Sequence, residues 1–77
     1  MLASGCAASK AYRQGERAVR AGNLDEAVAA YRRAMQADPR NPDYGIALQR
    51  TMVAASRAHL DRAKEFEDRD QLEAALG

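Results

Sequence analysis

The chain has 77 residues, a length that suits one small domain and excludes a multidomain enzyme with a large buried site. Hydrophobic residues make up 47% of the chain, but 18 of them are alanines, so few large side chains remain to build a core. Twelve Lys and Arg residues against eleven Asp and Glu give a net charge of +1, and nothing in this balance marks a nucleic-acid binder. Plentiful alanine, arginine and glutamate, with few β-branched residues, predict an all-α fold.

Residues 1–8 are small and uncharged, unlike the rest of the chain. Within them, the run Ala3 to Cys6 resembles a bacterial lipobox, in which small residues precede a cysteine that then carries lipid. Two hypotheses follow: residues 1–8 are the remnant of a lipoprotein signal with Cys6 as the lipidation site, or they are a disordered tail with a free thiol. The single cysteine excludes a disulfide within the chain, and no run of about 20 apolar residues is present to span a membrane.

Apolar residues at steps of three and four predict a first helix at about residues 9–21. Gly22 accepts the left-handed conformation that ends helices, so we expect a turn there. Asn23 and Glu26 have the spacing of a capping box, which predicts a second helix at about residues 24–37. This helix should end before Pro39, because the residue ahead of a proline is disfavoured in the helical region.

Asn41-Pro42 predicts the start of a third helix, since an amide side chain can cap it and the first helical position needs no N–H. We expect this helix at about residues 42–69, which at about 1.5 Å per residue is longer than the first two can cover. Part of it must project or meet something else. Its predicted apolar stripe consists of Leu48, Met52, Ala55, His59, Ala63 and Phe66. Asp70 to Glu73 repeats the capping-box spacing and predicts a fourth helix at about residues 71–77.

The chain is similar to itself at a shift of 48 residues, which pairs Leu24 with Leu72, and at a shift of 47, which pairs the two capping-box segments. The segment from about Ala8 to Asn41 resembles a tetratricopeptide repeat (TPR), whose usual period is about 34 residues. The resemblance is carried by small residues where the two helices would cross, an aromatic on the second helix and a proline in the linker. It implies a repeat core of Ala11, Gly15, Ala18, Leu24, Ala27, Tyr31, Ala34 and Pro39, with Gly22 at the turn.

The predicted organisation is therefore a tail at residues 1–8, a TPR hairpin at 9–41, and a long helix with a truncated second hairpin at 42–77. The chain departs from the family pattern in two ways. Ala11 and Gln14 stand where a tryptophan and a leucine are often found, and the second copy is displaced by about 14 residues beyond the usual period.

A lipobox-like start, one TPR hairpin and a long charged helix together resemble the amino-terminal region of bacterial outer-membrane secretins of type II secretion and type IV pilus systems. This resemblance implies a noncatalytic scaffold for protein–protein contacts in the cell envelope. It would lie on the periplasmic side of the outer membrane if Cys6 is a lipobox cysteine. The alternative is a soluble cytoplasmic TPR adaptor or regulator without an envelope role.

Stacked TPR hairpins form a concave groove that binds extended or helical peptides. The resemblance puts the groove-lining positions on Ser9, Tyr12, Glu16, Val19 and Arg20. Tyr12 has a second interpretation, in which it packs on a neighbouring helix. The expected partner is a protein or peptide, and so thin a core predicts that further repeats, self-association or a docked partner completes the structure.

Catalysis and cofactor binding are not expected. His59 and Cys6 are the only residues of their types and lie about fifty residues apart, so neither a metal cluster nor a Cys-His pair is formed within one chain. No glycine-rich phosphate loop is present. Five arginines on the first two helices could form a basic surface, but they lack the aromatic partners of a nucleic-acid site: Arg13, Arg17, Arg20, Arg32 and Arg33. A basic stripe could instead face anionic lipid headgroups if Cys6 is lipidated.

Overall fold

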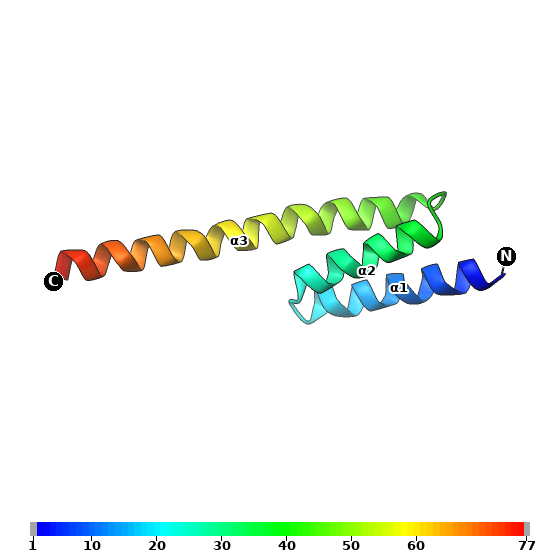
Figure 1. Cartoon of the computed structure of the whole chain (residues 1–77), viewed down its shortest axis with the longest axis horizontal. Helices are drawn as coiled ribbons and strands as arrows, with labels where there is room; N and C mark the ends of the chain where they lie inside the picture. The colour runs from blue at the N-terminus through cyan, green and yellow to red at the C-terminus, as the bar shows by residue number, and fades with distance from the viewer. Residues whose placement is uncertain (1, 77) are drawn as a thin grey trace.

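The computed structural model describes residues 2–76, with side chains from residue 5 onward, and it consists of three helices. These are α1 (Leu2–Arg20), α2 (Leu24–Ala37) and α3 (Pro42–Leu76), and no strand occurs in the described residues. The all-α prediction is confirmed. Figure 1 shows α1 and α2 as an antiparallel hairpin, with α3 lying along α2 and projecting well beyond the α1–α2 turn. The molecule is consequently long and narrow, measuring 64 × 18 × 14 Å.

The turn between α1 and α2 is a Schellman motif centred on Gly22. This glycine has a φ of 80°, and its N–H donates to the Val19 carbonyl at 3.0 Å. The Asn23 N–H donates to the Ala18 carbonyl at 2.9 Å, which completes the paired bonds of that motif. The predicted capping box is wrong, however, because the Asn23 side chain makes no cap hydrogen bond. The glycine, which ends α1, is what separates the two helices.

The start of α3 follows the prediction from Asn41-Pro42. The Asn41 side-chain oxygen accepts a hydrogen bond of 3.0 Å from the Asp43 N–H, which otherwise has no partner within the helix. Pro39, which the resemblance placed in the repeat core, is exposed in the linker. Its effect is on the backbone, because a proline ring fixes φ and cannot continue α2.

Helices α1 and α2 approach closely because small residues line their contact. The buried residues are Ala8, Ala11, Gly15 and Ala18 on α1 and Ala27, Ala30, Tyr31 and Ala34 on α2. At the centre, the Tyr31 ring lies directly against Gly15. A Cβ atom on Gly15 would fall 2.5 Å from Tyr31 Cδ1 and 2.9 Å from Cζ, closer than real contacts allow. Glycine is therefore required at this position by the packing.

A stack of three tyrosines, one from each helix, joins α3 to the hairpin. The Tyr12 ring centroid lies 5.4 Å from that of Tyr31 and 5.1 Å from that of Tyr44, in tilted arrangements typical of favourable aromatic pairs. Tyr44 itself is buried beside Ala8 and Ala34. Tyr12 thus contacts both halves of the core and links them.

The face of α3 that packs on α2 differs from the predicted stripe. Its buried residues are Tyr44, Thr51 and Ala55, and Thr51 satisfies its hydroxyl by donating to the Ala47 carbonyl at 2.7 Å. Of the predicted stripe, only Leu48 and Ala55 are at least half-buried, whereas Met52, His59, Ala63 and Phe66 are exposed. After Tyr44, small residues face α2 because the helices pack closely, and Met52 is left exposed, whereas His59, Ala63 and Phe66 lie on the part of α3 that projects beyond α2.

The predicted fourth helix does not form. α3 continues without a break to Leu76, because neither glycine nor proline interrupts the chain after Gly45 within the described residues. The Asp70–Glu73 segment is therefore interior helix and not a cap. Every residue from His59 to Leu76 is exposed, and we call this projecting half of α3 the overhang.

The first helix also begins earlier than expected, at Leu2 and not near residue 9. Alanine-rich sequence favours helix, and Ala8 is completely buried beside Ala34 and Tyr44, so the segment before residue 9 already contributes to the core. Residues 2–8, for which a signal remnant or a disordered tail was expected, are the first part of α1 in the structure.

Replacing Gly15 tests the central contact. We expect Gly15→Ala to lower the free energy of unfolding by about 1–2 kcal/mol, because the steric cost against Tyr31 exceeds alanine's higher helix propensity. The measurement is urea unfolding. The matched control is Gly45→Ala in α3, where the nearest atom, Met35 Cε, would lie 3.9 Å from the new Cβ. That change should be neutral or stabilising, and a Gly15 variant as stable as the control would contradict the packing argument.

Alkaline pH should destabilise the hairpin through Tyr31. Burial raises the pKa of its phenol above the ordinary value of 10.0, and the neighbouring charges of Tyr12 and Glu16 act in the same direction. The folded state therefore favours the neutral phenol, so this contribution to stability is complete below pH 10 and is lost as the pH rises through the folded pKa. Tyr31→Phe removes it. The stability of the wild type relative to this variant should be constant up to about pH 9.5 and fall as the pH rises above about 10, and an unchanged difference would show that the phenol ionises without cost to the fold.

Candidate functional site

The residues predicted to line a peptide groove share one face of α1. Ser9, Tyr12 and Glu16 are half-buried there, whereas Val19 is 40% exposed and Arg20 is exposed. The Tyr12 ring is held between Tyr31 and Tyr44, so it supports the helices as well as bordering this face. The accessible part of the face consists of the polar side chains and Val19.

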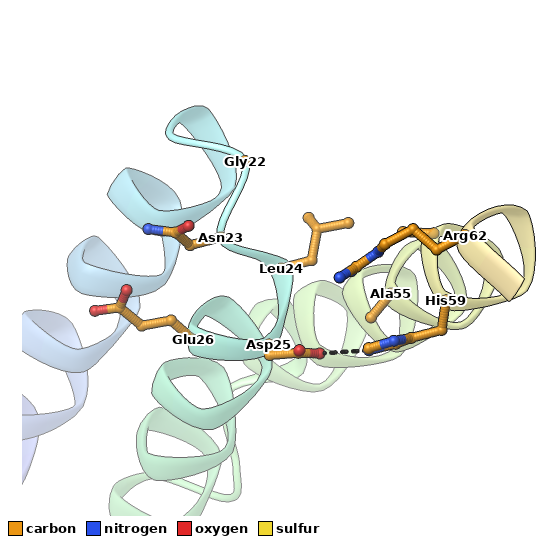
Figure 2. Close-up of a pocket in the computed structure, with 9 residues that line it drawn as sticks. Gly22, Asn23, Leu24, Asp25, Glu26, Ala55, His59 and Arg62 are labelled. Carbon is orange, nitrogen blue, oxygen red and sulfur yellow. Dashed lines mark hydrogen bonds and ion pairs between the residues drawn. The ribbon is translucent and has the colours of Figure 1, made fainter. Parts of the chain in front are cut away.

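A second candidate is an open groove of about 620 Å³ between the α1–α2 turn and α3. Figure 2 shows Gly22, Asn23 and Leu24 along the turn, with Ala55, His59 and Arg62 facing them from α3. The groove exists because α3 runs on past the turn, so its residues near His59 overlie the first turn of α2.

A hydrogen bond between Asp25 and His59 crosses this groove. The distance from His59 Nε2 to Asp25 Oδ1 is 3.1 Å, and the side chains remain 56% and 73% exposed. Asp25 lies in the first turn of α2, where a carboxylate is favoured by the helix dipole. Because both partners are solvated, the contact contributes at most about 1 kcal/mol.

The groove offers hydrogen bonding and charge rather than a constellation for covalent chemistry. Its lining contains an imidazole, the carboxylates of Asp25 and Glu26, and the guanidinium of Arg62, without a hydroxyl or thiol nucleophile. In the searched part of the chain, residues 2–76, no group of three or more His, Cys, Asp or Glu side chains is close enough to hold a metal ion.

Cys6, the predicted lipidation site, is a free, exposed thiol on α1. Leu24 of the predicted repeat core is half-buried at the start of α2, and the remaining core positions other than Pro39 are buried. The structure thus brings the core positions together and leaves Cys6 accessible on the outer surface of the hairpin.

Sequence reasoning missed the Asp25–His59 contact and interpreted His59 as a packing or boundary residue in the apolar stripe of the third helix. A signal was available in the chain. In an antiparallel pair, residues at similar distances from the turn lie side by side, and Asp25 and His59 are 16 and 18 residues from Asn41. Locating the contact required knowing that α3 continues well past the length of α2.

No protein-family model, curated protein or solved structure matches this chain. Within the described residues, no helix has both the length and the apolar character needed to cross a bilayer.

A double-mutant cycle measures the contact across the groove. We expect the coupling between Asp25→Ala and His59→Ala to be below about 1 kcal/mol in urea unfolding, because both side chains are solvated. The cycle is needed since Asp25→Ala alone also removes a favourable interaction with the α2 dipole. A coupling well above this value would mean that the pair holds α3 against the turn.

Proposed function

We propose that this chain is a noncatalytic TPR-like scaffold that binds a protein or peptide partner in a bacterial envelope secretion or pilus assembly of the secretin type. The observation that carries the proposal is the contact between α1 and α2, two antiparallel helices packed through small residues with the Tyr31 ring on Gly15. Gly15, Ala18, Ala27, Tyr31 and Ala34 are the positions on which the TPR resemblance rests.

A binding role is supported by the amount of side-chain surface that the fold leaves without a partner. Helix α3 packs on one side of the hairpin only, and the α1 face bearing Ser9, Glu16 and Val19 is accessible beside it. Repeat hairpins use such first-helix faces to hold peptides once neighbouring repeats are stacked beside them. Further repeats downstream would extend the same face.

The envelope location is supported by the lipobox-like run that ends at Cys6, whose thiol is exposed. Lipid on this residue would anchor the scaffold to a membrane on the periplasmic side of the outer membrane. The alternative is a soluble cytoplasmic TPR adaptor or regulator, in which Cys6 is an unmodified thiol.

Fractionation separates these two locations. The chain, tagged at its carboxyl end and expressed from its own locus, should enter the membrane fraction and incorporate a labelled fatty acid. Cys6→Ser should abolish both, and Ser9→Ala serves as a nearby control that leaves them intact. Recovery of the unlabelled wild type in the cytosolic fraction would favour the adaptor.

Crosslinking in the native host tests the groove. We expect the double variant Ser9→Glu with Val19→Glu to recover its envelope partner about tenfold less than the wild type, as for loss of about 1.4 kcal/mol of binding energy. The control, Ala29→Glu with Gln36→Glu, adds the same charge on exposed positions of α2. Equal loss in both variants, or none in the groove variant, would contradict binding at this face.

A further inference from the structure

Charge is distributed unevenly between the body of the molecule and the overhang. Residues 1–57 carry nine Lys and Arg against five Asp and Glu, whereas residues 58–77 carry three against six. The near-neutral total therefore conceals a basic body and an acidic projecting helix. Within residues 5–76, whose side chains are described, no Lys or Arg forms an ion pair with Asp or Glu, and the one carboxylate that contacts a titratable nitrogen is Asp25, at His59.

The basic charge of α1 lies on one face. We call this face the basic stripe, which consists of Lys10, Arg13, Arg17 and Arg20. Steps of three and four residues put these side chains in one row along the helix, and all four are exposed. The row lies away from the buried α1 face, so neither α2 nor α3 covers it. Among the described side chains, no carboxylate forms an ion pair with any of the four.

The overhang carries the complementary row. The acidic stripe consists of Asp61, Glu65 and Asp68, again at steps of four and three residues and exposed. Leu72 and Leu76 continue the same row at steps of four, with 60% and 80% of their surface exposed. Phe66 lies on a different face, where Arg69 of the same helix stands 5.8 Å from its ring centroid.

The two stripes cannot meet within one molecule. Figure 1 shows that the overhang extends past the α1–α2 turn, in the direction opposite to the amino-terminal end of α1. All residues of the overhang are exposed, and its contact with the hairpin lies at its first turn, where His59 meets Asp25. A partner for the acidic stripe must therefore come from another molecule.

We propose that the overhang docks on the basic stripe of a second copy of this chain, and that the contact is reciprocal. An antiparallel register matches the two rows: Asp61 meets Arg20, Glu65 meets Arg17 and Asp68 meets Arg13. The same register brings Leu72 to the aliphatic stem of Lys10 and Leu76 to the small apolar end of α1 near Cys6.

A two-fold axis perpendicular to the long axis produces both contacts at once. Helices α1 and α3 run parallel within one molecule because each is antiparallel to α2. Rotating a second copy by half a turn therefore makes its α3 antiparallel to the first copy's α1, and its α1 antiparallel to the first copy's α3. The result is a closed dimer in which each overhang lies on the partner's hairpin.

Charge complementarity favours a second copy of this chain over an anionic lipid surface as the partner of the basic stripe. The basic stripe exposes little apolar surface for insertion among acyl chains, whereas the chain itself supplies an acidic row of matching spacing with unpacked leucines. Exposed ion pairs are individually weak and are screened by salt, so association should be concentration-dependent and lost at high ionic strength.

Charge swapping tests the proposal by sedimentation equilibrium of the full chain in a reducing buffer. One variant reverses the acidic stripe (Asp61→Arg, Glu65→Arg, Asp68→Arg), and the other reverses the basic stripe (Arg13→Glu, Arg17→Glu, Arg20→Glu). Each should weaken self-association by about tenfold or more relative to the wild type, and an equimolar mixture should restore it, because both reciprocal contacts are then complementary. The wild-type dimer should dissociate between about 50 mM and 500 mM NaCl.

The control reverses Glu67, Asp70 and Glu73 to arginine, which changes the net charge of the overhang equally but off the stripe. It should keep dimerising, and circular dichroism should show helicity retained in every variant. A wild type that is monomeric at every concentration, or a mixture that fails to associate, would overturn the proposal. So would a monomer that binds vesicles of anionic phospholipid through the basic stripe, since that outcome assigns the stripe to a membrane.

Discussion

The fold depends on the contact between the Tyr31 ring and the bare backbone at Gly15. It lets α1 and α2 approach closely, and the alanines on both sides then fill the remaining space. Tyr12 stacks against the same ring, and Tyr44 stacks against Tyr12. The position of α3 therefore depends on a contact between α1 and α2. Three tyrosine rings surrounded by alanine side chains hold the core together.

The two halves of α3 are stabilised differently. The first half is held by the tyrosine stack and by the buried residues Thr51 and Ala55. The overhang meets the hairpin at its first turn, where His59 contacts Asp25, and an isolated helix of this length is marginal in water. It persists because the costly nucleation step has already occurred against α2, so each further residue only extends an existing helix. The overhang contains neither glycine nor proline, and its leucine, arginine, lysine, glutamate and alanine residues favour such propagation.

What could be predicted from the sequence was mainly local. The two turns could be predicted from Gly22 and Asn41-Pro42. A glycine in the left-handed conformation and a side-chain cap each depend on only a few neighbouring residues. The TPR resemblance predicted which residues form the core where α1 and α2 cross. All the predicted core residues on these two helices except Leu24 are buried.

The errors have physical causes as well. Asp70 to Glu73 has the spacing of a cap, but no preceding residue breaks the helix there. The stripe on α3 was assigned from residues at steps of three and four, whereas close packing on α2 buries Thr51 and Ala55 and leaves Met52 exposed, and Phe66 lies in the overhang beyond α2. The Asp25–His59 contact joins residues 34 positions apart and depends on how far α3 continues, which local patterns do not specify.

The tyrosine stack gives the molecule a built-in optical reporter of its tertiary structure. The chain has no tryptophan, and its three tyrosines lie in one cluster that joins all three helices. Their near-ultraviolet signal and fluorescence therefore describe the body alone, whereas the far-ultraviolet signal also includes the overhang. The two signals report on different parts of the chain. If their unfolding transitions are separate, the overhang unfolds while the hairpin stays folded.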